Sequence, residues 1–261
     1  MANPRLSTIE LIHRDDDPVA TMMLNRPERL NALSAETLRD VVRACRWLDE
    51  TEAIKAVVVR GAGRAFSAGF DLDDFRSLDG DASPRDNADL GRLAAEALTD
   101  VRPLTIAAIH GHCVGGGLVL AAACDLRVAA DTVRFSIPEV DLGIPLAWGG
   151  IPRLVRELGP ALTKELVLTC RPFDAEEAKA LRFLNRVVPE ALLFDEADAL
   201  ATELASKPGF ALRATKQHVN AVTEDLAGTR RNANDADTLV AAMADEESRA
   251  ISRAYLESKR H

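Results

Sequence analysis

The chain has 261 residues, of which 47% are hydrophobic and 28% are charged, as expected for one large soluble domain with a full hydrophobic core. Its 41 acidic residues outnumber its 32 basic residues and give a net charge of -9, which argues against nucleic acid as a main partner because phosphate backbones bind basic surfaces. No apolar run reaches the roughly 18–20 residues that a membrane span requires, so no membrane partner is expected.

The N-terminal residues favour a cytoplasmic protein. Residues 1–18 contain one short apolar patch and then three consecutive aspartates, whereas a secretory signal has a basic start and a longer apolar stretch, and a transit peptide avoids acidic residues. The cysteines are scattered and form no C-x-x-C pair, so they are expected to be buried free thiols. They are Cys45, Cys113, Cys124 and Cys170.

The first half of the chain alternates short apolar runs with amphipathic segments, which predicts an α/β fold. Ser34 stands where the N-cap of the first helix would lie. Residues 71–89 differ, because seven aspartates with Gly80 and Pro84 predict a polar loop or an irregular helix. The predicted strands cover 8–12, 19–24, 56–59, 104–109, 126–129 and 133–135, and the predicted helices cover 35–50, 89–101 and 118–124.

The second half of the chain is predicted to be mostly helical from Pro152 onward. The pattern therefore indicates an α/β core over residues 1–190 and a helical C-terminal region over 191–261. The predicted helices cover 161–169, 174–181, 190–206, 212–226 and 236–257.

Two glycine-rich turns follow predicted buried strands, at 67–72 and at 115–117. Glycine lets the backbone approach a ligand closely, and the second turn opens a short helix whose free amides would point outward. Two amides that converge from two such turns would form an oxyanion hole, the alternative being two tight packing turns. Gly61-Ala62-Gly63 lacks the third glycine of a dinucleotide-binding fingerprint, and His110 and His112 are interpreted as structural residues rather than metal ligands.

Glu139 is the candidate acid–base group. It follows Pro138 in an otherwise apolar segment, and burial would raise the pKa of its carboxyl group and suit it to general base catalysis. The alternative is an ordinary surface glutamate in a turn.

Taken together in this order, the motifs resemble those of the enoyl-CoA hydratase/isomerase, or crotonase, superfamily over most of the chain. Each motif alone is weak, but the ordered set is specific. The motifs are N-R-P-E-R-L-N-A-L at 25–33, R-A-F-S-A-G-F-D-L at 64–72, I-H-G at 109–111 with the glycines up to 117, C-D-L-R at 124–127, and P-E, L-G, G-G and R-L at 138–139, 142–143, 149–150 and 153–154.

The resemblance implies a crotonase-like spiral of ββα repeats, with C-terminal helices that support a homotrimer or a hexamer made of two trimers. It implies an acyl-CoA thioester as substrate, and no metal or other cofactor. The amides of Ala68 and Gly116 would hold the thioester oxygen, with Glu139 as the catalytic acid–base residue. The resemblance places the following residues along the substrate: Arg29, Leu30, Ala65, Phe66, Ala68, Gly69, Phe70, Asp71, Leu72, Gly116, Val119 and Trp148.

The chain departs from the hydratase pattern at the second catalytic glutamate, where it carries Val119. It also lacks the aspartate that some members carry eight residues after the Glu139 position, where it has Ala147. A single carboxylate favours an enoyl-CoA isomerase, and Trp148 would either form a wall of the acyl pocket or pack at a subunit contact. Two alternatives stay open: a hydratase that uses Asp141 or a residue of 71–89, and a protein that binds acyl-CoA without turning it over.

Overall fold

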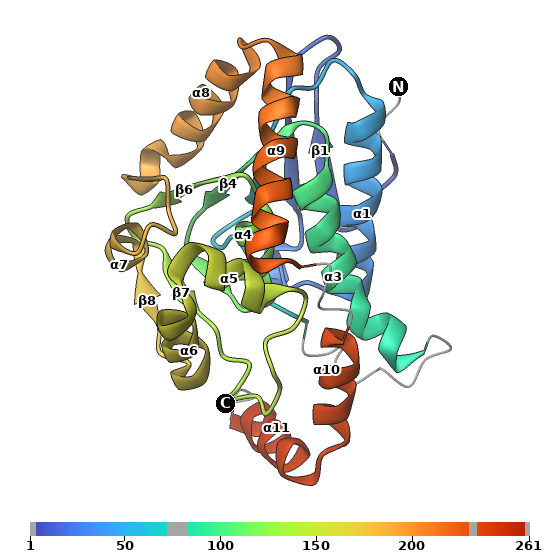
Figure 1. Ribbon diagram of the computed structural model, residues 1–261, viewed down its shortest axis with the longest axis vertical. Coiled ribbons are helices and arrows are strands. Elements are labelled where there is room, and N and C mark those ends of the chain that lie inside the picture. Colours follow the sequence, from blue (N-terminus) through green and yellow to red (C-terminus); the bar gives the residue numbers. More distant parts are fainter. Residues whose placement is uncertain (1–3, 72–82, 230–233, 259–261) are drawn as a thin grey trace.

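The computed structural model describes residues 4–71, 83–229 and 234–258 (Figure 1). A six-stranded main sheet has the order β1-β2-β3-β4-β6-β9, in which β1 and β2 pair antiparallel and the other neighbours pair parallel. Its strands are β1 (Ile9–Ile12), β2 (Val19–Leu24), β3 (Ala56–Gly61), β4 (Leu104–Ile109), β6 (Leu126–Ala130) and β9 (Arg186–Val188).

The central strands carry apolar side chains on both faces of the main sheet. The side chains of β3 and β4 are almost all buried, whereas on the edge strand β1 buried and exposed residues alternate. Parallel strands covered on both faces are typically continuous apolar runs, which is why the sequence identified them.

A second, three-stranded sheet has the order β5-β7-β8. Its strands are β5 (His112–Val114), β7 (Arg134–Ser136) and β8 (Phe173–Asp174). The chain passes from β4 directly into β5, and later from β6 into β7. Each of these repeats therefore adds one strand to the main sheet and one strand to the second sheet. This repetition confirms the predicted mixed α/β fold.

Helices cover both faces of the main sheet. One core lies between the sheet and the helices α1, α3 and α4, and a second core lies between the opposite face and α8. Figure 1 shows α8 on one flank, α1 and α3 on the other, and α10 with α11 at one end of the molecule. The helices are α1 (Ala35–Glu50), α3 (Pro84–Asp100), α4 (Gly116–Ala123), α5 (Gly150–Leu158), α6 (Pro160–Thr169), α7 (Ala175–Ala180), α8 (Leu193–Ala205), α9 (Gly209–Ala227), α10 (Asp235–Ala244) and α11 (Glu246–Ser258).

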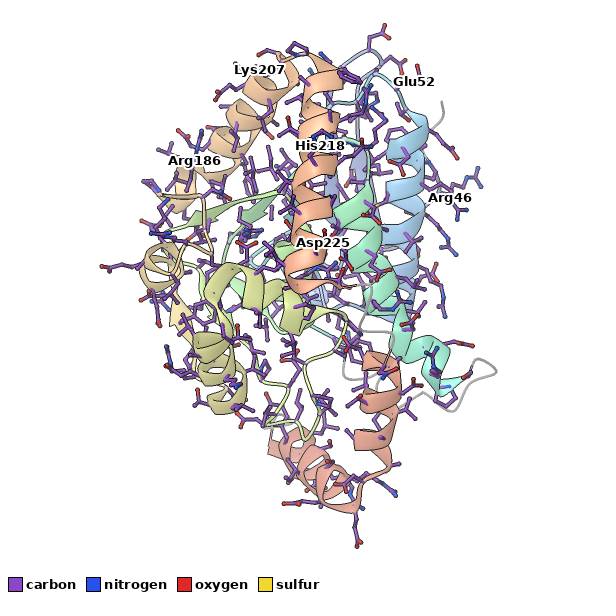
Figure 2. All side chains as sticks on the ribbon, in the orientation of Figure 1. Arg46, Glu52, Arg186, Lys207, His218 and Asp225 are labelled. Atoms are coloured by element: carbon purple, nitrogen blue, oxygen red, sulfur yellow. The ribbon has the colours of Figure 1, made fainter. Side chains whose placement is uncertain are left out.

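Charged side chains project from the outside of these elements, as Figure 2 shows for Arg46, Lys207 and Asp225. The predicted N-cap is confirmed, because Ser34 Oγ accepts from the Thr37 amide at 3.1 Å. The four cysteines are buried and free, as predicted. Among the described helices, none is long and apolar enough to cross a membrane.

The largest differences from the predicted helices concern α3, α5 and the C-terminal pair α10 and α11. Helix α3 begins at Pro84, five residues before the predicted start, because proline is well accommodated in the first turn of a helix. Helix α5 was not predicted, since its start at the glycine pair 149–150 resembles a loop. The helix predicted over 236–257 is two helices, because the Asp245 carboxylate accepts from the Ser248 amide at 2.9 Å and so caps a new helix.

Candidate functional site

An apolar pocket with a free volume of about 50 Å³ lies between the turns that follow β5 and β7 and the helices α3 and α10. Glu139 is the one ionisable side chain of its lining within the described ranges, and Asn87 is its other polar residue. The lining consists of Phe70, Asn87, Ala88, Gly116, Val119, Glu139, Ile144, Pro145, Leu146, Ala147, Trp148, Leu239 and Met243.

The register of β5 and β7 brings Glu139 to the glycine turn. Val114 pairs with Ser136 at the ends of these parallel strands, and the Gly115 amide donates to the Ser136 carbonyl at 2.9 Å. The carboxylate of Glu139 then lies directly over Gly115, where a Cβ atom would come within 2.3 Å of Oε1. Gly115 also has a φ of 47°, a conformation that other residues rarely adopt.

Burial gives the Glu139 carboxyl group a strongly shifted pKa. Oε2 is excluded from solvent and has no hydrogen-bond partner among the described residues, although part of the residue reaches solvent. Desolvation raises the pKa of Glu139 from 4.5 to about 7, and a hydrogen bond from its own backbone amide opposes this only partly. A carboxyl group with a pKa near neutrality can both accept and return a proton under ordinary conditions.

This pKa predicts a pH-dependent stability. The folded-state pKa lies above the unfolded value, so the neutral carboxyl favours folding below about pH 4.5, and that stability is lost as the pH rises through about 7. Each pKa unit corresponds to about 1.4 kcal/mol, and after allowance for the exposed part of the residue we expect a loss of about 2 kcal/mol. In urea unfolding at pH 8, Glu139→Gln should be more stable than the wild type by this amount, and at pH 4.5 the gain should vanish. Equal gains at both values would contradict the burial of this carboxyl.

The amide donors of the first glycine-rich turn differ from those expected. The Ala68 amide donates to the Leu30 carbonyl at 2.9 Å, so it is engaged inside the protein and does not face the pocket. The Leu33 amide donates to the Gly69 carbonyl, and the Leu33 carbonyl accepts from the Asp71 amide. In such a parallel bridge the amide of the intervening residue, Phe70, points away from Leu33. Phe70, rather than Ala68, lines the pocket.

The second turn supplies Gly116, the first residue of α4. Amides of the first helical turn have no partner within their helix and lie at the positive end of its dipole. The two turns touch at Gly69, where a Cβ atom would lie 3.7 Å from the Gly116 nitrogen and 2.8 Å from the Val114 carbonyl oxygen. The two glycine-rich turns therefore meet at one side of the pocket.

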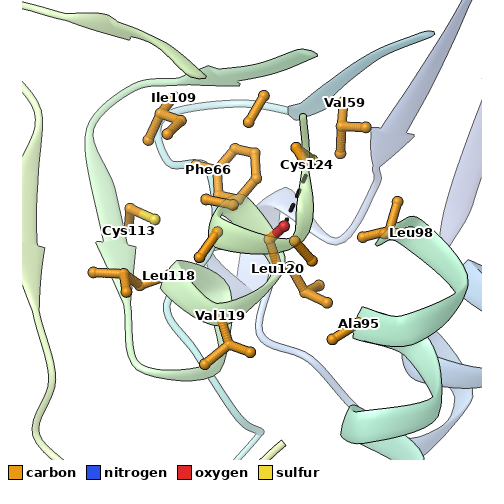
Figure 3. Close-up of a cluster of buried hydrophobic side chains, with 14 of the residues drawn as sticks. Val59, Phe66, Ala95, Leu98, Ile109, Cys113, Leu118, Val119, Leu120 and Cys124 are labelled. Carbon is orange, nitrogen blue, oxygen red and sulfur yellow. Dashed lines mark hydrogen bonds between the residues drawn. The ribbon is translucent and has the colours of Figure 1, made fainter. Parts of the chain in front are cut away.

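Several residues expected along the substrate lie outside the pocket lining. Ala65 and Phe66 are completely buried, and Asp71 is buried in an ion pair with Arg26 at 2.8 Å. Arg29 is exposed and Leu30 is half-buried beside the first turn. The predicted residue Leu72 lies outside the described residues. Figure 3 places Phe66 in the core on one side of α4.

Val119 projects from the other side of α4 and forms part of the pocket wall (Figure 3). Ala147 also lines the pocket, so the two positions at which a second carboxylate was considered both carry apolar side chains there. Asp141 is exposed, lies beside Cys170, and is not part of the lining.

Sequence reasoning missed several lining residues, among them Asn87, Leu239 and Met243. Asn87 lies in the first part of α3, within a segment that was predicted to be a polar loop or an irregular helix. Leu239 and Met243 lie one helical turn apart on α10. Their spacing indicates an apolar face, but only the three-dimensional arrangement shows that this face covers the pocket.

Comparisons with known proteins agree on one family. A model of the enoyl-CoA hydratase/isomerase family matches residues 14–261. A Mycobacterium tuberculosis protein named "Probable enoyl-CoA hydratase" is 40% identical over 82% of both chains. The short-chain-enoyl-CoA hydratase of Clostridium acetobutylicum is 32% identical over 80% of both chains. The crystal structure of an enoyl-CoA hydratase/isomerase from Mycobacterium paratuberculosis has a TM-score of 0.85 at 28% identity and covers 95% of this chain and 99% of the other.

Proposed function

The chain belongs to the enoyl-CoA hydratase/isomerase family, and on that premise we propose that it moves the double bond of a 3-enoyl-CoA thioester into conjugation with the carbonyl group. The observation that carries the proposal is that Glu139 is the one ionisable residue found in the described pocket lining. Double-bond transfer needs one group that removes a proton and returns it, and it needs no activated water.

In the proposed mechanism, the amides of Phe70 and Gly116 donate to the thioester oxygen. They polarise the carbonyl group and stabilise the dienolate that forms when Glu139 removes a proton from C2. Glu139 then returns the proton to C4, so the double bond moves from C3–C4 to C2–C3 and no atom is gained or lost. One such amide donor is worth about 2.7–4 kcal/mol of transition-state stabilisation. Phe70 replaces Ala68 in this proposal, because the Ala68 amide already donates to Leu30.

The apolar wall supports the same conclusion. Among the described lining residues, Val119 and Ala147 leave Glu139 without a second carboxylate that could hold and orient a water molecule. A dry pocket also protects a reactive dienolate from unwanted proton exchange with solvent.

The test is a paired assay of the purified protein with 3-enoyl-CoA and 2-enoyl-CoA substrates, followed by absorbance and mass. Conjugation of the 3-enoyl substrate without a change in mass is the expected result. Addition of one water to the 2-enoyl substrate, with no conjugation of the 3-enoyl substrate, would overturn the assignment.

Hydration is the second candidate function, and two observations favour it. Relatives that cover most of the chain are named as hydratases, and Asn87 lines the pocket together with Glu139. An amide and a carboxylate could together hold a water molecule. Asp141, considered for this role from the sequence, lies away from the pocket lining.

Val119→Glu distinguishes the two candidates. Position 119 is one helical turn from Gly116, so a glutamate there would face Glu139 across the pocket and supply the missing group. We expect this variant to gain measurable hydration and to isomerise more slowly than the wild type, with Val119→Gln as the uncharged control of the same length. A wild type that already hydrates as fast as Val119→Glu would favour the second candidate.

We further propose that the chain assembles into homotrimers or hexamers in the cytoplasm and uses no metal or other cofactor. Large apolar side chains on one face of α9 support assembly, since Val219, Val222 and Leu226 are 58%, 60% and 79% exposed.

A further inference from the structure

The side chain of Trp148 occupies a slot between two glycines that are distant in sequence. Gly91 lies in α3 and Gly116 begins α4. A Cβ atom at Gly91 would come within 1.9 Å of Cδ2 of the indole, and one at Gly116 within 2.2 Å of Cζ3. The indole can lie there only because both positions lack a side chain.

The surrounding structure fixes the indole in this slot. Trp148 itself has a φ of 62°, a conformation that a bulky residue adopts only when its surroundings hold it there. The next amide, that of Gly149, donates to the Asp235 carboxylate of α10 at 2.7 Å. Phe70 packs edge-on against the indole with ring centroids 5.7 Å apart. Trp148 is only 7% exposed and is therefore a fixed wall.

This wall forms one side of the pocket, next to Gly116 of the proposed reaction centre. The acyl group would begin at the amides of Phe70 and Gly116, pass Glu139, and meet the indole together with Leu239 and Met243. The free volume is about 50 Å³. A cavity of about 150 Å³ accepts benzene, so the described pocket has room for only a few carbon atoms.

We propose that Trp148, seated on Gly91 and Gly116, determines substrate length and restricts the site to short acyl groups of about four carbons. This proposal rests on the proposed function in so far as the ligand is an acyl-CoA thioester. It does not depend on whether the enzyme isomerises or hydrates that thioester.

The experiment measures binding of two saturated thioesters, butyryl-CoA and octanoyl-CoA, by isothermal titration calorimetry. Saturated chains do not react, so the result is independent of the chemistry. The wild type should prefer butyryl-CoA by roughly tenfold or more, since the longer chain cannot be buried. Trp148→Ala should bind octanoyl-CoA roughly tenfold more tightly than the wild type does, whereas Trp148→Phe, which keeps an aromatic ring in the slot, should show a smaller gain.

Gly91→Ala tests the contact between Gly91 and the indole without changing a residue of the proposed reaction centre. Its methyl group would displace the indole into the remaining free volume and should weaken butyryl-CoA binding. In the double variant Gly91→Ala/Trp148→Ala the methyl group has nothing to displace, so binding should return to that of Trp148→Ala. If the effects of the two substitutions on butyryl-CoA binding simply add in the double variant, the indole and position 91 are not in direct contact.

The outcomes separate the two proposals. Equal binding of butyryl-CoA and octanoyl-CoA by the wild type would overturn the length limit and leave the proposed function intact. A wild type that binds neither thioester would overturn both. A preference for butyryl-CoA that persists in Trp148→Ala would show that another residue sets the limit and would overturn the assignment to Trp148.

Discussion

Glu139→Gln should lower kcat for double-bond transfer by about 10²–10⁴-fold, the range that a positioned general acid–base group contributes. Glutamine has nearly the same shape but cannot accept the C2 proton. Binding of butyryl-CoA should persist, because the amides that hold the thioester oxygen are unchanged. In the wild type, kcat/KM should rise with pH through about 7 as the Glu139 carboxyl ionises, and a residual activity of the variant should lack this dependence.

Steady-state kinetics from pH 5.5 to 9 check this result, with Asp141→Asn as the matched control. Asp141 lies two residues away, is exposed, and is outside the pocket lining, so its variant should keep wild-type kcat. The higher stability expected for Glu139→Gln at pH 8 separates loss of chemistry from loss of fold. A wild type that binds butyryl-CoA but turns over neither enoyl substrate would indicate a non-catalytic acyl-CoA-binding protein.

Gly115→Ala should impair turnover by roughly 10²-fold or more without removing any catalytic group. The added Cβ would lie 2.3 Å from Oε1 of Glu139, so the carboxylate must move, and a displacement of about 1 Å in a reacting group can cost that much. A positive φ in a residue with a side chain also costs roughly 1–2 kcal/mol of stability.

The two effects can be separated with Gly159→Ala as a control. Gly159 also has a positive φ, of 79°, but a Cβ there meets nothing within 4 Å. Gly159→Ala should therefore lose stability in urea unfolding and keep its kcat. If the two alanine variants lose activity equally, backbone strain rather than displacement of Glu139 is the cause.

The sequence predicts those parts of the molecule that local patterns determine. The apolar runs of β3 and β4 are recognisable because both of their faces are covered, and the cap at Ser34 acts within one helical turn. Glu139 stands out because a carboxylate in an apolar segment next to proline is unusual. Each of these features depends on neighbours within a few residues.

The parts that the sequence did not predict depend on distant partners. Which amide of the first glycine-rich turn faces the pocket is decided by the pairing of Leu33 with Phe70, far upstream in the chain. Asp71 is an acidic residue in a glycine-rich turn and was expected along the substrate, yet it forms an ion pair with Arg26. The slot of Trp148 requires Gly91 and Gly116 together, and no local pattern relates the three positions.

The pairing of β5 with β7 has a consequence for how the chain can change in length. Gly115 and Glu139 are brought together by strand register, so the exposed turn between β6 and β7 can gain or lose residues without moving the site, provided that the register of β5 and β7 is kept. The two residues between Ser136 and Glu139 have no such freedom, because a single deletion there would draw the carboxylate back from Gly115. Natural insertions and deletions should therefore be tolerated at the exposed residues 131–132 between β6 and β7 and excluded from 136–139.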